Sequence, residues 1–343
     1  MLRSVIPLLR CPVCQSQRSR LEAHAFAEGL AGHIKDGALA CGVCGSWYPI
    51  EDELLELVKP ELLYQEDYAA FVGRFSVELK RLGFAPDSAR SESDLSAQFL
   101  QRRHFDWYAD NPEQTYNAYQ NSPFWKAFDA ATFGSWRRAL KPGGAILDVG
   151  CADGRSCFQF INQGSTVVGM DISKALIRRA IERAAKANAQ SSTSFFVADA
   201  TALPLRDESV EYVVIYGVLH HVPDPAATCR EAYRVLKPRG IYFGSENNAT
   251  ILRKVFDLLM KWMPIWREEA GQQALISQRN ITEWLRGLPA SLSCRSSVFL
   301  PPHLVNLFGR RGARVALGAS DKLFHLIPGL RGQGGLIVFE VRK

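Results

Sequence analysis

The chain has 343 residues, 47% of them hydrophobic and 22% charged, which is enough for about two globular domains with large cores. No apolar run approaches the roughly 18 to 20 residues of a membrane span. Pro7 and Arg10 interrupt the only apolar stretch near the N-terminus, so a signal peptide is not expected and the sequence predicts a cytoplasmic protein. The net charge of +6 lies in residues 295–343, where eight Lys/Arg stand against two acids. Such a tail is either a surface for phosphates of RNA or lipid, or an ordinary solvated surface.

Four of the eight cysteines form two C-x-x-C pairs near the N-terminus: Cys11 with Cys14, and Cys41 with Cys44. Two such pairs can supply four thiolates to one tetrahedral zinc ion, and a four-cysteine set leaves no open coordination position. The sequence therefore predicts a structural Zn²⁺ site. Disulfides are the alternative, but thiols stay reduced in the cytoplasm. A redox C-x-x-C motif needs a βαβ context that this end of the chain lacks.

The sequence around these cysteines resembles a known family. L-L-R-C-P-V-C, followed by L-A-C-G-V-C-G-S-W-Y-P-I-E-D, is similar to the small zinc ribbons that activate tRNA and protein methyltransferases. The resemblance covers about residues 8–58 and departs at Glu53, where the family usually has glycine. We therefore expect a zinc-ribbon domain over residues 1–58, whose folding depends on the metal.

Residues 59–140 are expected to form a helical connector or lid between the ribbon and a core domain. Apolar spacing predicts a helix over 61–83, and A-P-D-S-A-R-S-E-S-D predicts a loop after it. An aromatic-rich stretch extends from Phe99 to Trp136. We expect most of its rings to pack between domains and one or two to line a pocket.

The organising stretch of the chain is A-I-L-D-V-G-C-A-D-G-R, residues 145–155. Apolar residues lead to Asp148, a small-residue turn follows, and residues 156–161 begin a helical pattern. Gly150 and Gly154 have no Cβ, so the backbone of such a turn can approach a ligand closely. Alone, this turn is equally compatible with a tight connection that binds nothing.

Alternating strands and helices follow this turn. Strands are predicted at 166–170, 194–197, 210–216 and 240–244, with helices at 174–187 and 225–236. This alternation predicts an α/β fold with a doubly wound parallel sheet, in which ligands bind beyond the carboxyl ends of the strands. Four polar residues fall at such ends: Asp148, Asp171, Asp199 and Tyr216.

Asp171 is well placed to accept both hydrogen bonds of a ribose diol, and Asp199 to read an adenine amino group. A nicotinamide dinucleotide is the competing ligand, but its G-x-G-x-x-G fingerprint is absent.

D-V-G-C-A-D-G, with D-I-S, A-D-A and L-H-H-V-P-D-P, resembles the class I S-adenosylmethionine-dependent methyltransferases, with the ubiquinone, menaquinone and sterol enzymes most similar. The resemblance covers about residues 140–245 and implies a seven-stranded Rossmann-like sheet in a domain over 141–343. It departs where Ala152 and Arg239 replace usual glycines. The cofactor residues that the resemblance and the strand ends indicate are Asp148, Gly150, Cys151, Ala152, Gly154, Asp171, Ile172, Asp199, Ala200 and Tyr216.

His220 and His221, just past the fourth core strand, are the candidate general bases, because a histidine pKa near 6.5 suits proton removal. His221 aligns with the family histidine before V-P-D and is the preferred choice. The alternative for each histidine is a structural residue hydrogen-bonded to backbone at a strand end.

Residues 249–334 are predicted to be an insertion that selects the substrate, followed by the last strand at 335–341. Its first part, 249–266, is amphipathic and suits a pocket wall, an interface or a helix lying on a membrane surface.

The leading functional hypothesis is S-adenosylmethionine-dependent methylation of a small-molecule or lipid-linked metabolite, because L-H-H-V-P-D-P replaces the Asn/Asp-Pro-Pro-Tyr motif typical of nucleic-acid and protein amino-methylating enzymes. The second hypothesis is an RNA base methyltransferase that binds RNA through the ribbon and basic tail. The third is a partner-docking module that binds the cofactor without turnover.

Overall fold

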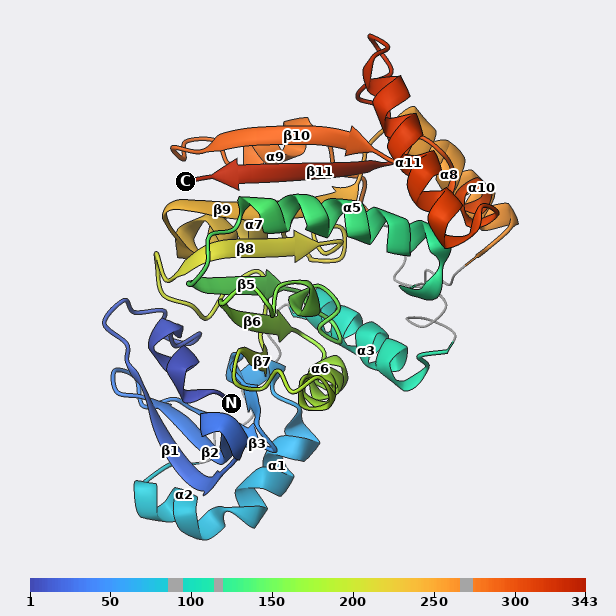
Figure 1. Ribbon diagram of the computed structural model, residues 1–343. Coiled ribbons are helices and arrows are strands. Elements are labelled where there is room, and N and C mark those ends of the chain that lie inside the picture. Colours follow the sequence, from blue (N-terminus) through green and yellow to red (C-terminus); the bar gives the residue numbers. More distant parts are fainter. Residues whose placement is uncertain (86–94, 114–119, 266–273) are drawn as a thin grey trace.

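The computed structural model describes residues 1–85, 95–113, 120–265 and 274–343 (Figure 1). The N-terminal part begins with a 3₁₀ helix, η1 (Arg3–Leu8), and continues through four strands, β1 (Leu21–Glu28), β2 (Ile34–Cys41), β3 (Trp47–Glu51) and β4 (Leu54–Glu56). The predicted helix over 61–83 is two helices, α1 (Gln65–Arg74) and α2 (Ser76–Leu82), after a short 3₁₀ turn at Pro60–Leu62. Tyr116, Tyr119 and Trp266 lie outside the described residues.

Five parallel strands form the centre of the core domain: β5 (Ala145–Val149), β6 (Thr166–Asp171), β7 (Thr193–Val197), β8 (Val210–Tyr216) and β9 (Leu236–Asn247). Every residue of β5 and β7 is buried, because strands of a parallel sheet are covered on both faces. Helices α5 (Pro123–Ala139) and α6 (Lys174–Lys186) pack on one face, and α7 (Pro225–Val235) and α9 (Gln278–Trp284) on the other.

Helix starts follow local capping signals. The side chains of Ser122, Ser173, Asp224 and Ser277 accept backbone N–H groups at the starts of α5, α6, α7 and α9, respectively. Such caps satisfy donors that have no partner within the helix. The helix predicted from residue 156 is wrong: one 3₁₀ turn at Cys157–Gln159 is present instead, because β6 begins soon after, at Thr166.

The predicted α/β, Rossmann-like fold class is confirmed, but the sheet is larger than predicted. Within the described residues it has eleven strands, in the order β1-β2-β3-β4-β7-β6-β5-β8-β9-β11-β10. The strands from β5 to β11 make up the expected seven, and the ribbon adds four because β4 pairs in parallel with β7. The ribbon is therefore continuous with the core sheet rather than merely tethered to it.

The C-terminal part adds an antiparallel edge and a group of helices. β10 (Ser291–Ser297) and β11 (Leu336–Arg342) complete the sheet. α8 (Ile251–Trp262), α10 (Pro302–Asn306) and α11 (Gly309–His325) gather at the end of the sheet away from the ribbon strands (Figure 1). Across the described ranges, no helix is both long and apolar enough to cross a bilayer.

Candidate functional site

The four N-terminal cysteines converge in the ribbon. Their sulfur atoms all lie within 4.8 Å of one another, with Sγ–Sγ distances of 3.6 Å for Cys11–Cys44 and 3.8 Å for Cys14–Cys41. A tetrahedral zinc ion with Zn–S bonds of about 2.3 Å requires sulfur atoms roughly 3.8 Å apart. The Tyr48 hydroxyl lies 2.9 Å from the Cys11 sulfur. The residues therefore fit a structural Zn²⁺, and such a hydrogen bond to a ligand sulfur would orient it.

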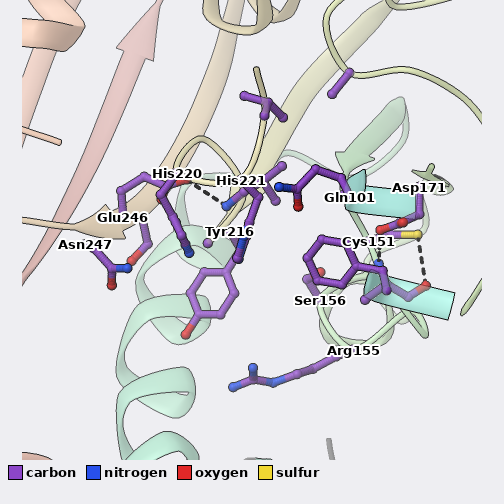
Figure 2. Close-up of a pocket in the computed structure, with 18 of the residues that line it drawn as sticks. Gln101, Cys151, Arg155, Ser156, Asp171, Tyr216, His220, His221, Glu246 and Asn247 are labelled. Carbon is purple, nitrogen blue, oxygen red and sulfur yellow. Dashed lines mark hydrogen bonds and ion pairs between the residues drawn. The ribbon is translucent and has the colours of Figure 1, made fainter. Parts of the chain in front are cut away.

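A second site is a cavity at the carboxyl ends of the parallel strands (Figure 2). Its inner wall comes from the ends of β5, β6, β7 and β8, and its other walls come from α3 (Ser96–Asp110), the start of α5, and α8. All the predicted cofactor and catalytic residues line this cavity except Asp148 and Gly154.

Asp148 lies behind the turn instead of in the cavity wall. Its carboxylate is fully buried and accepts hydrogen bonds from the Ser156 hydroxyl (2.5 Å) and the Cys157 thiol (3.0 Å). Burial raises the pKa of Asp148 to about 6, although these two groups donate to it. Asp148 therefore holds the turn in shape, and the turn's Gly150, Cys151 and Ala152 face the cavity.

Asp171 ends β6 and lines the cavity directly. One carboxylate oxygen accepts the Ala152 N–H and the other the Ser173 N–H, each at 2.9 Å. Burial raises its pKa to about 6 despite these two bonds. Each oxygen retains a second lone pair for a hydroxyl in the cavity. These two acceptor oxygens fit the ribose hydroxyls of an adenosyl cofactor.

Ala152 adopts a left-handed conformation, with φ of 50°, at the position where the resembled family has glycine. In this conformation its N–H donates to the Asp171 carboxylate. The alanine is therefore accommodated at a cost in backbone energy, which is of order 1 kcal/mol for a residue with a Cβ.

Asp199 follows β7 at the same edge of the sheet. One carboxylate oxygen accepts both the backbone N–H and the hydroxyl of Thr201, each at 2.8 Å, and the other lies 3.5 Å from the Gln98 amide of α3. The helix of the connector thus contacts the predicted adenine-binding end of the cavity.

His220 is paired with a carboxylate that the sequence did not single out. Its Nδ1 lies 2.6 Å from Oε2 of Glu246, near the end of β9, and both side chains are buried. The other oxygen of Glu246 accepts the backbone N–H groups of Val218 (2.8 Å) and Leu219 (2.6 Å). Burial raises the pKa of Glu246 to about 7 despite these bonds. When Glu246 is ionised, His220 donates through Nδ1 and Nε2 is the basic nitrogen of the neutral ring.

His221 has a more apolar setting. Its ring packs edge-on against Phe105 at a centroid distance of 5.1 Å and lies 4.0 Å from the ring of His220. Burial, and then the neighbouring His220, hold the pKa of His221 well below its usual range. The environment therefore favours His220 over His221 as a proton acceptor.

Arg155 and Tyr216 converge on Asp129 of α5 beside the cavity. The Arg155 Nε donates to Asp129 at 3.0 Å, and the Tyr216 hydroxyl donates to it at 2.7 Å. The guanidinium also lies 5.5 Å from the ring centroids of Trp125 and Tyr216. Tyr216 is thus fixed by a partner 87 residues away in the chain, which local pattern could not reveal.

The remaining wall is aromatic and aliphatic. More of the aromatic stretch lines the cavity than the one or two residues predicted: His104, Phe105, Tyr108, Phe124 and Trp125. α8 contributes Arg253, Phe256, Asp257 and Met260, and the Arg253 Nε is 2.6 Å from an Asp257 oxygen.

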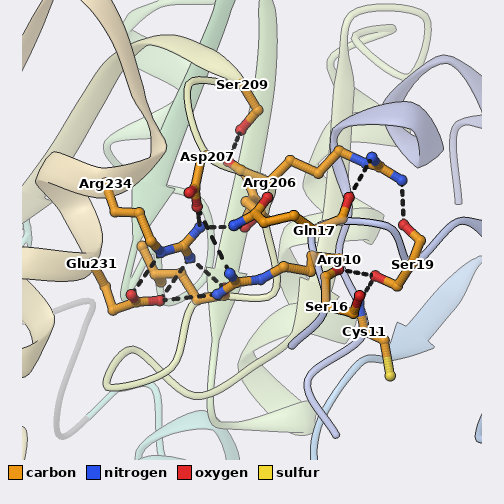
Figure 3. Close-up of polar contacts among 12 residues, drawn as sticks. Arg10, Cys11, Ser16, Gln17, Ser19, Arg206, Asp207, Ser209, Glu231 and Arg234 are labelled. Carbon is orange, nitrogen blue, oxygen red and sulfur yellow. Dashed lines mark hydrogen bonds and ion pairs between the residues drawn. The ribbon is translucent and has the colours of Figure 1, made fainter. Parts of the chain in front are cut away.

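Three arginines, of which Arg10 is buried, join the ribbon to the core (Figure 3). Arg10, 6% exposed, lies 3.7 Å from Asp207 and 3.8 Å from Glu231, which also bind Arg234. Arg206 of the core donates to the ribbon carbonyls of Leu9, Gln17 and Ser19. Because Arg10 precedes Cys11, this contact lies next to the cysteine cluster.

Comparison with known proteins confirms both resemblances predicted from the sequence. Residues 147–244 match the family described as methyltransferase domain, and residues 3–53 match the Trm112p-like protein family. The chain is 37% identical over 102 residues to the 27-O-demethylrifamycin SV methyltransferase of Amycolatopsis mediterranei, covering 29% of this chain and 38% of that protein. It is 29% identical over 164 residues to the ubiquinone biosynthesis O-methyltransferase of Hahella chejuensis, covering 45% and 66%. The chain thus spans less than two thirds of either relative.

Among solved structures, a complex containing the Haloferax volcanii Trm112 methyltransferase activator is 17% identical, with a TM-score of 0.47 over 69% of this chain and 96% of that chain. The PH0226 protein of Pyrococcus horikoshii is 19% identical, with a TM-score of 0.47 over 69% and 98%.

Proposed function

We propose that this chain, in which a Trm112p-like domain precedes a class I methyltransferase domain, transfers a methyl group from S-adenosylmethionine to an uncharged small-molecule or lipid-linked acceptor. The observation that carries the proposal is the meeting of Asp171, Asp199 and the Glu246–His220 pair in one cavity. These groups come from the ends of different strands, and together they offer a nucleoside-binding site next to a proton-accepting histidine.

The sulfonium methyl group of the bound cofactor would supply the electrophilic carbon. The chain's own residues then have three tasks: to hold the cofactor, to align the acceptor and to remove its proton. In this proposal Asp171 accepts the ribose hydroxyls, the residue 150–152 turn and Tyr216 border the methionine part, and Ile172, Asp199 and Ala200 border the adenine. Asp148 acts through the turn that it holds.

His220 is the proposed proton acceptor, and Glu246 its positioning residue. The carboxylate fixes the ring through Nδ1 and would stabilise the imidazolium that forms when Nε2 takes a proton. His221, which the sequence favoured, is assigned here to the apolar wall beside Phe105.

The charges of the cavity support an uncharged acceptor. Arg155 is paired with Asp129, and Arg253 with Asp257, so the positive charge of each arginine is already balanced and does not favour a negatively charged acceptor. The aromatic lining around them suits a flat or apolar group. Rifamycin- and ubiquinone-pathway methyltransferases among the relatives are consistent with such an acceptor.

The RNA alternative depends on the basic tail, which would meet phosphates. A non-catalytic role is disfavoured because the proposed base already has its carboxylate partner. The proposal also includes a cytoplasmic location and the division into a ribbon (1–58), a connector (59–140) and a core with its insertion (141–343, with the insertion at about 249–334).

The test uses purified protein, S-adenosylmethionine with a labelled methyl group, and extract from cells that lack the gene. We expect label in the organic-soluble fraction, and loss of that label with Asp171→Ala. Label in RNA that is sensitive to ribonuclease would support the RNA alternative instead. Cofactor binding by calorimetry without labelled product in any fraction would favour the non-catalytic role.

A further inference from the structure

The C-terminal helices carry an unusual share of exposed apolar side chains. Of the seventeen large hydrophobic residues exposed in the described ranges, thirteen lie between Ile251 and Leu330. We use the name helical cap for three segments: α8 with the adjoining Met263, α10 with the adjoining Leu307 and Phe308, and α11 with the residues that follow it to Leu330. Its exposed apolar residues are Ile251, Val255, Leu258, Trp262, Met263, Leu304, Leu307, Phe308, Val315, Leu323, Leu326, Ile327 and Leu330. Concentrations of this kind mark interaction surfaces.

On α8 these residues form one stripe. Ile251, Val255, Leu258 and Trp262 follow the i, i+4, i+7, i+11 spacing of a single helix face, and Trp262 is 79% exposed. The opposite face of α8 is occupied by the protein itself, since Phe256 is buried. α8 therefore has two apolar faces: one packs against the protein, and the other, the stripe, is exposed.

Cations accompany the exposed apolar side chains. Lys254 and Lys261 lie along one side of the stripe of α8, and α11 exposes Arg310, Arg311, Arg314 and Lys322. Helices α8, α10 and α11 contain two acidic residues, and both have partners. Asp257 pairs with Arg253, and Asp321 accepts hydrogen bonds from the Ser297 hydroxyl and the Val298 N–H. The His303 ring, 2.6 Å from the Met263 carbonyl, joins the end of α8 to α10, and α10 packs on α11.

We propose that the helical cap docks on the surface of an anionic phospholipid bilayer. Exposed aromatic and aliphatic side chains next to Lys and Arg match the boundary between acyl chains and negative headgroups. A second copy of the chain is a poorer occupant, because a cap-to-cap contact would bring the cations of one copy against those of the other.

The same helix also borders the cavity. Phe256 and Met260 line it from the inner side of α8, within one turn of Val255 and Leu258 on the outer stripe. Docking would place the cavity next to the bilayer, where a lipid-linked acceptor resides. This last step rests on the proposed function, whereas membrane docking itself does not.

The test is flotation of the full chain with vesicles of phosphatidylcholine alone or with 30% phosphatidylglycerol, without cofactor or acceptor. We expect binding to the anionic vesicles that weakens at least tenfold in 0.5 M salt. Leu258→Glu/Trp262→Glu and Arg310→Glu/Arg311→Glu should each reduce binding at least tenfold. The matched controls are Val77→Glu, an exposed apolar residue of α2 (65% exposed), and Lys80→Glu/Arg81→Glu on the same helix.

Brominated lipids give a second measurement. They should quench tryptophan fluorescence of the wild type, and Trp262→Phe should remove most of that quenching although six other tryptophans remain. Circular dichroism and cofactor affinity of each variant show that it is folded.

Failure of the wild type to bind anionic vesicles would overturn the proposal, as would equal losses in the α2 controls. A concentration-dependent dimer that Trp262→Glu dissociates would assign the cap to self-association instead. Vesicle binding without methyl transfer would leave docking supported and the proposed function unsupported.

Discussion

Glu56, the last residue of ribbon strand β4, forms a buried ion pair with Lys174, the first residue of α6. Their side chains are 4% and 5% exposed, respectively. Lys174 follows Asp171 and Ile172 of the proposed cofactor site, and its backbone N–H donates to the Tyr64 hydroxyl at 2.9 Å. Through this pair the ribbon contacts the start of α6, three residues after the proposed cofactor-binding carboxylate of Asp171.

Glu56→Gln should lower the free energy of unfolding by roughly 3 kcal/mol, because it leaves a buried ammonium with an incomplete partner set. Urea denaturation measures this. Asp67→Asn is the matched control: Asp67 lies 2.7 Å from Lys174 but is 38% exposed, so its loss should cost less than about 1 kcal/mol. An equal loss of unfolding free energy in the two variants would contradict the larger contribution assigned to the buried Glu56.

Removal of the metal should destabilise more than the ribbon. We expect one zinc per chain by elemental analysis, and its loss in Cys14→Ser, with a fall in Tm of about 10 °C or more. The core should be affected because Arg206 binds ribbon carbonyls on both sides of Cys14. Cys294→Ser, a half-buried cysteine of β10, is the control and should retain zinc with Tm nearly unchanged. A metal-free wild type with the same Tm would contradict a structural zinc.

Cofactor affinity should depend on pH through Asp171. Its pKa is raised to about 6 by burial, so the ionised form that accepts ribose hydroxyls is lost as the pH falls through 6. We expect the Kd of S-adenosylhomocysteine to rise toward tenfold per pH unit below 6, as measured by calorimetry between pH 5 and 8. Asp171→Asn should bind weakly at every pH and lose this dependence.

The same raised pKa has the opposite effect on the ligand-free chain. A folded-state pKa above the unfolded value means that the native state prefers the protonated carboxyl. The corresponding stability is present below about pH 4 and is lost as the pH rises through 6. If affinity and stability of the free chain changed in the same direction across this range, Asp171 would not be the responsible group.

His220→Ala should lower kcat by about 10² to 10⁴ while the Kd of the cofactor changes little, because general-base catalysis contributes on that scale. Glu246→Gln should lower kcat less and shift its acidic pH limb, since it alters the ring's partner without removing the ring. The comparison variant is His221→Ala. A larger loss of kcat in His221→Ala than in His220→Ala would restore the assignment that the sequence favoured.

Arg239→Gly should stabilise the chain by roughly 0.5 to 1 kcal/mol. Arg239 has φ of 67°, a left-handed conformation that glycine adopts without strain. Chemical denaturation measures the gain, and Arg239→Ala should show none because it keeps the Cβ. A gain of equal size in Arg239→Ala would attribute the effect to the side chain's charge.

The three departures from family glycines share this geometry. Glu53, Ala152 and Arg239 have φ values of 67°, 50° and 67°. The resemblance identified the three positions in the sequence, but the sequence carried no information on their backbone angles. The conformation is set by the surrounding turn, which overrides the preference of the residue placed there.

The order of elements and the strand ends could be predicted because apolar runs and turn residues are local signals, and Asp171 and Asp199 were found for this reason. The four cysteines were found from another local signal, their C-x-x-C spacing. Glu246 and Asp129 were missed because their importance lies in partners 26 and 87 residues away in the chain. The joined sheet was missed because β4 is only three residues long and its pairing with β7 leaves no pattern in either segment.

Leu55 pairs with Phe196, which the ribosome adds to the chain 141 residues later. The ribbon emerges first and has an open strand edge at β4 until the third core strand has been made. An open edge is a site for pairing with other chains. Early capture of zinc by Cys11, Cys14, Cys41 and Cys44 would therefore keep the nascent ribbon folded while its permanent neighbour is still being translated.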